Sequence, residues 1–174
     1  INSISALCEE TGANIQEVSK AIGTDTRIGN KFLNAGPGFG GSCFKKDILN
    51  LVYLCKFYGL NEVADFWEQI VKINSWQQKR ISSLVIRNLF GTISNKRLAI
   101  LGFSFKACTN DTRESPSIAI SKELLKEGAK LAFYDPKVSK NQIKTALKDS
   151  FNESQLIFSN SAFEATDGAD AALI

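Results

Sequence analysis

The sequence predicts an α/β protein in which an all-helical part, residues 1–90, is followed by a doubly wound parallel sheet, residues 91–174. In the first part apolar residues recur every three or four positions, which is the spacing of one face of a helix. After Gly91 short apolar runs alternate with helical patterns in a β-α-β-α-β-α-β series. Strands that alternate with helices run parallel, because each helix carries the chain back across the sheet.

Two short helices open the chain, and each ends at a glycine. Residues 1–10 form the first predicted helix, which stops near Gly12. Asn14, with Glu17 three residues later, has the spacing of a capping box. This pair opens a second helix, which ends at Gly23.

The next two helices follow a polar, irregular segment, residues 24–34. The third helix carries one apolar stripe, made of Phe44, Ile48, Leu51 and Cys55. After Asn61 a fourth helix, residues 62–89, would span about 42 Å. A helix of that length commonly bridges domains or subunits.

The strands and helices of the second part are short. We expect strands at residues 97–102, 129–134, 156–158 and 169–174, and helices at residues 117–127, 139–149 and 161–166.

A glycine-rich stretch is the strongest functional signal; it reads Gly36-Pro37-Gly38-Phe39-Gly40-Gly41-Ser42-Cys43-Phe44-Lys45-Lys46-Asp47. Four glycines in six residues indicate a loop whose backbone a ligand can approach. We predict Ser42 as the N-cap of the third helix, so that Cys43 lies in its first turn. The helix dipole and the two lysines would favour the thiolate, and Cys43 is therefore a candidate nucleophile.

Asp47 lies one helical turn after Cys43, close enough to orient a water molecule or to accept a proton. The alternative for Cys43 is a buried structural cysteine, because free cysteines are among the most buried residues.

The turn after the first strand reads Gly102-Phe103-Ser104-Phe105-Lys106-Ala107. It is a dinucleotide-binding fingerprint in which Ser104 and Ala107 replace the second and third glycines, as in a Rossmann-like sheet. Lys106 is either a charge for a bound phosphate, at the edge where such sheets bind ligands, or an ordinary solvated lysine. Further on, residues 110–116 are polar and precede a helix, which suggests capping or ligand contact. Within them Arg113 stands between two acids, as an anchored guanidinium would.

Composition excludes several classes of function. The net charge of +3 is small and the basic residues are scattered, unlike those of nucleic-acid-binding proteins. We find no membrane-spanning run and no signal peptide. Without histidine the segment has no Ser-His-Asp or Cys-His catalysis and no histidine-containing metal site. The four cysteines form no CxxC pair, which favours a reducing compartment. We expect part of a cytoplasmic enzyme without a metal.

Four motifs together resemble the UDP-glucose 6-dehydrogenases, a family of nucleotide-sugar dehydrogenases. They are Gly38-Phe39-Gly40-Gly41-Ser42-Cys43-Phe44-x-Lys46-Asp47, Ile100-Leu101-Gly102-Phe103-x-Phe105-Lys106, Asp111-Thr112-Arg113-Glu114-Ser115 and Tyr134-Asp135-Pro136-Lys137. The resemblance implies a central helical dimerisation domain, residues 1–90, and most of a UDP-binding domain, residues 91–174. Because the chain begins inside a helical pattern and ends inside a strand, we expect it to be a segment. The N-terminal NAD-binding domain and the C-terminal tail would lie outside it.

The resemblance also implies an activity, the oxidation of the C6 alcohol of a UDP-sugar to a carboxylate with two NAD+. Cys43 would be the nucleophile that forms a thiohemiacetal and then a thioester, and Asp47 would assist the water or the base. Arg27 would reach the active site of a neighbouring subunit, a strand of residues 34–40 would bind the substrate, and the long helix would be the interface of a homo-oligomer. The implied substrate-binding residues are Arg27, Phe32, Leu33, Asn34, Ala35, Gly36, Pro37, Gly38, Phe39, Gly40, Phe105 and Lys106. The implied NAD-binding residues are Cys43, Phe44, Lys45, Lys46 and Arg113.

Other functions stay open at this point. GDP-mannose and UDP-N-acetylmannosamine dehydrogenases share the cysteine motif, although the phenylalanine-rich turn and Asp111-Thr112-Arg113-Glu114-Ser115 favour UDP-glucose. The segment alone could also be a non-catalytic UDP-binding or dimerisation module.

Overall fold

The structure, a computed structural model, describes residues 1–148 and 150–174 and confirms the predicted α/β class. The chain forms two compact units, residues 1–38 and residues 39–174. The predicted domain boundary at residue 90 therefore falls inside the second unit, and it stays a prediction about how the protein is organised.

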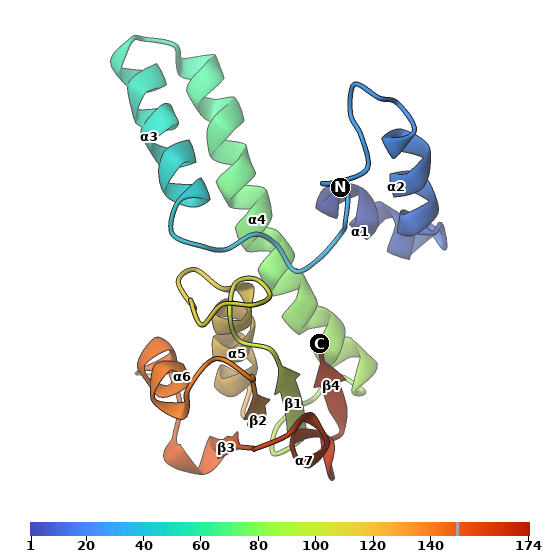
Figure 1. Ribbon diagram of the computed structural model, residues 1–174, viewed down its shortest axis with the longest axis vertical. Helices are drawn as coiled ribbons and strands as arrows, with labels where there is room; N and C mark the ends of the chain where they lie inside the picture. Colours follow the sequence, from blue (N-terminus) through green and yellow to red (C-terminus); the bar gives the residue numbers. More distant parts are fainter. Residues whose placement is uncertain (149) are drawn as a thin grey trace. The chain divides into compact units, whose positions relative to one another are not determined.

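The first unit consists of α1 (Asn2–Thr11), α2 (Ile15–Gly23) and an irregular segment (Figure 1). As predicted, α1 stops at Gly12, which adopts the left-handed conformation with φ of 74°. The Asn14 side chain caps α2 by accepting a hydrogen bond from the N–H of Gln16 at 2.8 Å. The predicted capping box needed the N–H of Glu17 instead, so the cap is confirmed but the box is not.

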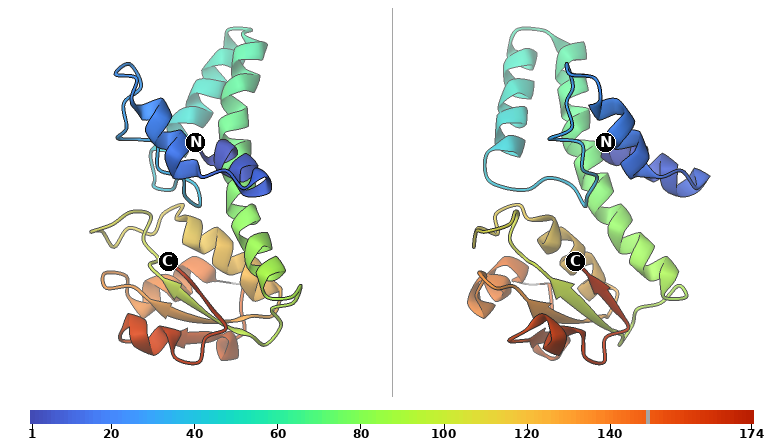
Figure 2. Two further views of the ribbon diagram at one scale, coloured as in Figure 1. Left: turned by 90° about the vertical axis from the view of Figure 1, so that its right-hand side faces the viewer. Right: turned by 45° about the vertical axis from the view of Figure 1, so that its right-hand side comes forward.

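An antiparallel helical hairpin opens the second unit, with α3 (Phe44–Phe57) and α4 (Asn61–Asn88) side by side (Figures 1 and 2). Ile48, Val52 and Cys55 of α3 form a buried cluster with Ala64 of α4. Within the predicted apolar stripe, Phe44 is 51% exposed and packs edge-on against the ring of Phe39.

The carboxyl-terminal half of α4 packs on the sheet instead of on α3. Ile81, Val85, Ile86 and Leu89 lie against the main hydrophobic core of the α/β part. A single helix thus contributes to both the hairpin and the sheet, which explains why both belong to one compact unit. None of the helices described in the chain is long and apolar enough to cross a lipid bilayer.

The sheet confirms the predicted parallel, doubly wound arrangement. Its strands are β1 (Arg97–Leu101), β2 (Lys130–Tyr134), β3 (Leu156–Phe158) and β4 (Ala171–Leu173), paired in parallel in the order β3-β2-β1-β4. The helices between them are α5 (Pro116–Lys126), α6 (Lys140–Leu147) and α7 (Ala162–Thr166), with a 3-10 turn at Glu153–Gln155. The end of the helix predicted at 139–149 falls on residue 149, outside the described residues.

Both faces of the sheet are covered by helices. Large side chains such as Leu98 and Phe133 pack with α5 and α6 on one face, whereas Ala99 and Ala132 pack against Ala165 of α7 on the other. The chain moves outward from β1 to β3 and returns to place β4 on the opposite side of β1. Open α/β sheets bind ligands beyond the carboxyl ends of strands at such a reversal, here the end of β1.

Candidate active site

The glycine loop before α3 is held by hydrogen bonds from two directions. The side-chain amide of Asn74, on α4, accepts the N–H of Phe39 at 2.8 Å and donates to the carbonyl of Phe39 at 3.0 Å. Two residues later the N–H of Gly41 donates to the carbonyl of Arg113 at 2.9 Å. The loop therefore lies between the long helix and the polar turn that precedes α5.

Two glycines of this loop are required by the closeness of that packing. A Cβ on Gly40 would lie 2.3 Å from the carbonyl oxygen of Glu114. Gly41 has φ of 89°, and a Cβ there would lie 2.9 Å from the ring of Phe105. Only glycine fits both positions without displacing a neighbour.

Cys43 is exposed at the start of α3, at the edge of the glycine loop. The alternative of a buried structural cysteine is therefore wrong for Cys43, whereas Cys8 and Cys55 are buried. The prediction that Ser42 caps the helix is also wrong, because the N-cap is Cys43 itself and no side chain caps it. Ser42 instead places its hydroxyl 3.7 Å from the Cys43 sulfur. Since the glycine loop turns one residue later than predicted, the helix begins at Phe44.

Asp47 occupies the first turn of α3. Its N–H donates to the carbonyl of Cys43 at 2.8 Å, which is the first hydrogen bond of the helix. The Asp47 side chain is exposed. Its assistance to a water molecule stays a prediction.

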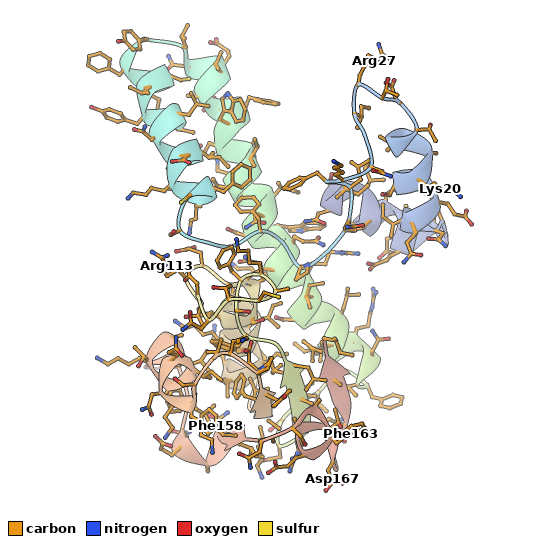
Figure 3. All side chains as sticks on the ribbon, in the orientation of Figure 1. Lys20, Arg27, Arg113, Phe158, Phe163 and Asp167 are labelled. Carbon is orange, nitrogen blue, oxygen red and sulfur yellow. The ribbon has the colours of Figure 1, made fainter. Side chains whose placement is uncertain are left out.

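Arg113 is the anchored guanidinium that the sequence predicts. It donates to both carboxylate oxygens of Asp111, the shortest bond being 2.7 Å (Figure 3 labels Arg113). Hydrogen bonds from Arg113 hold the pKa of Asp111 down to about 2. The bond to Asp111 raises the pKa of Arg113, and the negative charge of an ionised Cys43 acts in the same direction. Arg113 therefore lies within electrostatic reach of the Cys43 sulfur.

A cavity of about 540 Å³ opens beside the start of α3. It is lined by Gly41, Ser42, Lys45, Lys46, Leu49, Arg113 and Glu114. Lys45 makes an ion pair with Glu114 at 2.8 Å, so it neutralises a wall of the cavity. Lys46 is exposed, and no ion pair of Lys46 is found among residues 1–148 and 150–174. Three of the predicted NAD-binding residues thus surround one cavity.

Phe105 and Lys106 follow β1 at the point where the strand order reverses. Lys106 is exposed. Its ammonium lies 5.3 Å from the centre of the Phe105 ring, which is within the range of a cation–π interaction. The same loop is held at its base by Asp135, which accepts the N–H groups of Phe103, Ser104, Lys137 and Val138. Burial alone would raise the pKa of Asp135, but these four bonds to its charged form outweigh burial and lower the pKa.

The remaining predicted substrate residues, Arg27 and residues 32–38, belong to the first unit. Arg27 projects from an exposed loop (Figure 3) and forms a bidentate pair with Asp25, with a shortest distance of 2.6 Å. Phe32 is 94% exposed. The segment is fixed by bonds from Ser19 to the carbonyl of Leu33 and from the N–H of Gly36 to Asn2.

Two further observations concern this segment. Leu33, Asn34 and Ala35 line a cavity of about 380 Å³ with residues of α2. Residues 34–40 form no strand, contrary to the prediction, because the glycines and Pro37 break a regular extended backbone and no ladder pairs with it. The structure thus groups residues 39–47, 105–106 and 113 in one unit and residues 27 and 32–38 in the other.

Sequence reasoning missed three residues of the site. The sequence carries one weak signal for Asn74, which is a polar residue of the long helix about one turn before Gln77, and Gln77 is buried in the structure. Glu114 was noted only as a neighbour of Arg113, although its partner is Lys45. The role of Asp135 depends on contacts more than 30 residues apart, which no local pattern reveals.

Comparisons with known proteins find the family that the sequence motifs resemble. The profile "UDP-glucose/GDP-mannose dehydrogenase family, central domain" matches residues 1–76, and the profile of the family's "UDP binding domain" matches residues 99–174. UDP-glucose 6-dehydrogenase of Gallus gallus is 56% identical over 180 aligned residues, which cover all of this chain and 36% of the chicken protein. UDP-glucose 6-dehydrogenase 1 of Glycine max is 56% identical over 147 residues, 84% of this chain and 31% of the soybean protein.

A solved structure also matches. The UDP-glucose dehydrogenase of the archaeon Pyrobaculum islandicum is similar with a TM-score of 0.83 and 25% identity, covering 98% of this chain and 38% of the archaeal chain. The chain therefore spans little more than a third of the length of the animal and archaeal relatives.

Proposed function

Because the chain belongs to the UDP-glucose/GDP-mannose dehydrogenase family, we propose that it is part of an NAD-dependent UDP-glucose 6-dehydrogenase. It would supply the nucleophilic cysteine and the UDP-binding domain. The observation that carries the proposal is the exposed Cys43 at a helix start, beside a cavity lined by Lys45, Lys46 and Arg113. The identity of 56% to the chicken enzyme supports UDP-glucose as the substrate.

In this proposal the sugar C6 alcohol is first oxidised to an aldehyde, with loss of a hydride and a proton. The Cys43 thiolate adds to the aldehyde carbon, and the resulting alkoxide takes up a proton to give a thiohemiacetal. Loss of a second hydride and of the hydroxyl proton leaves a thioester on Cys43. Water then attacks the thioester carbonyl, the carbon–sulfur bond breaks, and the carboxylate and the free thiolate are released.

NAD+ would accept the two hydrides. The cavity fits the negatively charged diphosphate of such a cofactor, because Lys46 and Arg113 offer cationic donors and the first turn of α3 adds the positive end of a helix. Arg113 is already oriented by Asp111, so little side-chain entropy would be lost when it binds an anion.

We assign binding of the UDP-sugar to the loop that follows β1. Phe105 offers a ring face and Lys106 a charge at the reversal of strand order, where ligands of such sheets bind. Arg27 and residues 32–40 would complete the substrate site, with Arg27 serving a neighbouring subunit. We further propose a homo-oligomer formed through α4 and a cytoplasmic location, which the four free cysteines support.

Asp47 is proposed to take a proton from the attacking water. In Asp47→Asn the amide cannot do so, and hydrolysis should slow more than formation of the acyl-enzyme. We expect a thioester adduct on Cys43 to accumulate during turnover, visible by intact mass after acid quenching. Asp65→Asn, which changes an exposed carboxylate of α4, serves as the control and should show no adduct. A fall in turnover without an adduct would contradict the role of Asp47 in hydrolysis.

The proposed function is tested by NAD reduction in the full-length protein with UDP-glucose, GDP-mannose and UDP-N-acetylmannosamine. We expect UDP-glucose to give the highest kcat/KM, with two NADH formed per acid. A preference for another nucleotide sugar would overturn the substrate assignment. Binding of UDP without any NAD reduction would leave the non-catalytic module as the function.

A further inference from the structure

We propose that Asn74 is a positioning residue that sets the place of the Cys43 sulfur by fixing the backbone of Phe39. Asn74 lies on α4, 35 residues after Phe39 in the sequence, and it is not among the residues that line the cavity beside α3. The inference rests on the proposed function only for its catalytic consequence.

The contact itself is specific to an amide. The Asn74 oxygen accepts the N–H of Phe39 at 2.8 Å, while the Asn74 nitrogen donates to the carbonyl of the same residue at 3.0 Å. Both bonds are partly buried. A side chain that satisfies a backbone donor and a backbone acceptor through two separate atoms must carry both kinds of group, which a carboxylate or a methyl group does not. The position therefore selects for asparagine, whose reach from α4 matches the loop.

The two bonds between Asn74 and Phe39 matter because the glycine loop has no secondary structure of its own. For residues 39–42, the one other backbone bond found in the described part of the chain is that from Gly41 to the carbonyl of Arg113. Glycines at positions 40 and 41 give the backbone wide freedom once an anchor is lost. With both anchors, the loop enters α3 in a single conformation and presents the sulfur at a fixed point. Without Asn74, the segment before Gly41 can swing about the remaining bond.

The helix that carries Asn74, α4, is long and packed, which suits it to hold the loop in place. α4 contributes to the buried hairpin cluster at one end and to the core of the sheet at the other. Asn74 lies between these two regions along the helix, which is therefore packed on both sides of Asn74. Side chains on rigid elements hold reacting groups more accurately than side chains on loops.

The first experiment needs no enzyme activity. Iodoacetamide alkylation of Cys43 and Cys108, the two exposed cysteines of this unit, is followed by peptide mass spectrometry in the same full-length sample. Cys43 is already exposed, so its rate reports the charge around the sulfur more than its accessibility. In Asn74→Ala we expect the Cys43 rate, relative to Cys108, to fall at least about threefold because the sulfur no longer keeps its place near Arg113. Asn88→Ala, which removes an amide bonded within α4 itself, should leave the ratio unchanged.

The second experiment measures turnover. We expect kcat in Asn74→Ala to fall at least about tenfold, and kcat in Asn74→Asp to fall less because Asn74→Asp keeps the acceptor for the Phe39 N–H. Asn74→Asp also keeps the shape of the side chain, so it tests the inference even if Asn74→Ala does not fold. An unchanged alkylation ratio would overturn the inference. A fall of kcat in Asn74→Asp as large as that in Asn74→Ala would overturn it as well, because the bond to the Phe39 N–H would then not matter. If the unaltered protein oxidises no nucleotide sugar, the proposed function fails, while the alkylation ratio still decides the role of Asn74.

Discussion

Cys43→Ser is expected to lower acid formation by the full-length protein on the order of 10⁴-fold or more, the scale seen when an enzyme loses its nucleophile. A serine hydroxyl is nucleophilic only when a base removes its proton, and the described chain contains no histidine to do so. The hydroxyl would also lack the charge that lets an ionised Cys43 interact with Arg113. Formation of the acid, assayed by chromatography of the nucleotide sugars, is the measurement.

Two controls make the result specific to the sulfur. Cys108→Ser changes the other exposed cysteine of the same unit, at a residue with φ of 62°, and should keep full activity because cysteine and serine tolerate that conformation alike. Calorimetry with UDP should show unchanged affinity in both variants. Substantial acid formation by Cys43→Ser would refute the covalent route, since no thioester could form.

The elements were predictable where local patterns determine them. The alternation of apolar runs and helices predicted the parallel sheet, and Gly12 marked a helix end through its backbone conformation. The polar residues 110–116 suggested capping or ligand contact, and one of them, Ser115, caps α5. The long helix was predicted at 62–89 and lies at Asn61–Asn88, because one apolar stripe runs through it. Such signals depend on residues a few positions apart, which a sequence displays directly.

The errors in the site have a common cause, which is that its contacts join distant segments. Ser42 was expected to cap α3 from its residue type, yet the positive φ of Gly41 and its bond to Arg113 turn the chain so that Cys43 takes the N-cap. Phe44 was assigned to the apolar stripe of α3 by spacing, but its ring packs against Phe39 of the loop. Asn74 and Glu114 act on residues 35 and 69 positions away. The sequence thus indicated candidate residues for the chemistry, whereas only the structure shows which residues hold those candidates in place.

Gly40→Ala tests how strictly the loop must pack, and its expected effect is second only to loss of the cysteine. The new Cβ would lie 2.3 Å from the carbonyl oxygen of Glu114, 2.9 Å from its carbonyl carbon and 3.1 Å from Cδ of Pro116. Carbon and oxygen atoms need about 3.3 Å even in close contacts, so one side must move by about 1 Å. Glu114 cannot yield easily, because it already has φ of 53° and is followed by the N-cap Ser115 and by Pro116 in the first turn of α5.

The glycine loop must therefore be displaced, and Cys43 lies three residues further on. A displacement of about 1 Å at a reacting group can cost 100-fold in rate, and the loss of the Gly41 bond to Arg113 would add to it. We expect kcat to fall more than about 100-fold. Gly40→Ala combined with Pro116→Ala should stay equally inactive, since the severe clash is with the backbone oxygen and not with the proline ring. Recovery of activity in that double variant, or activity of Gly40→Ala near that of the unaltered protein, would show that the turn before α5 gives way and that the loop is not held as the contacts indicate.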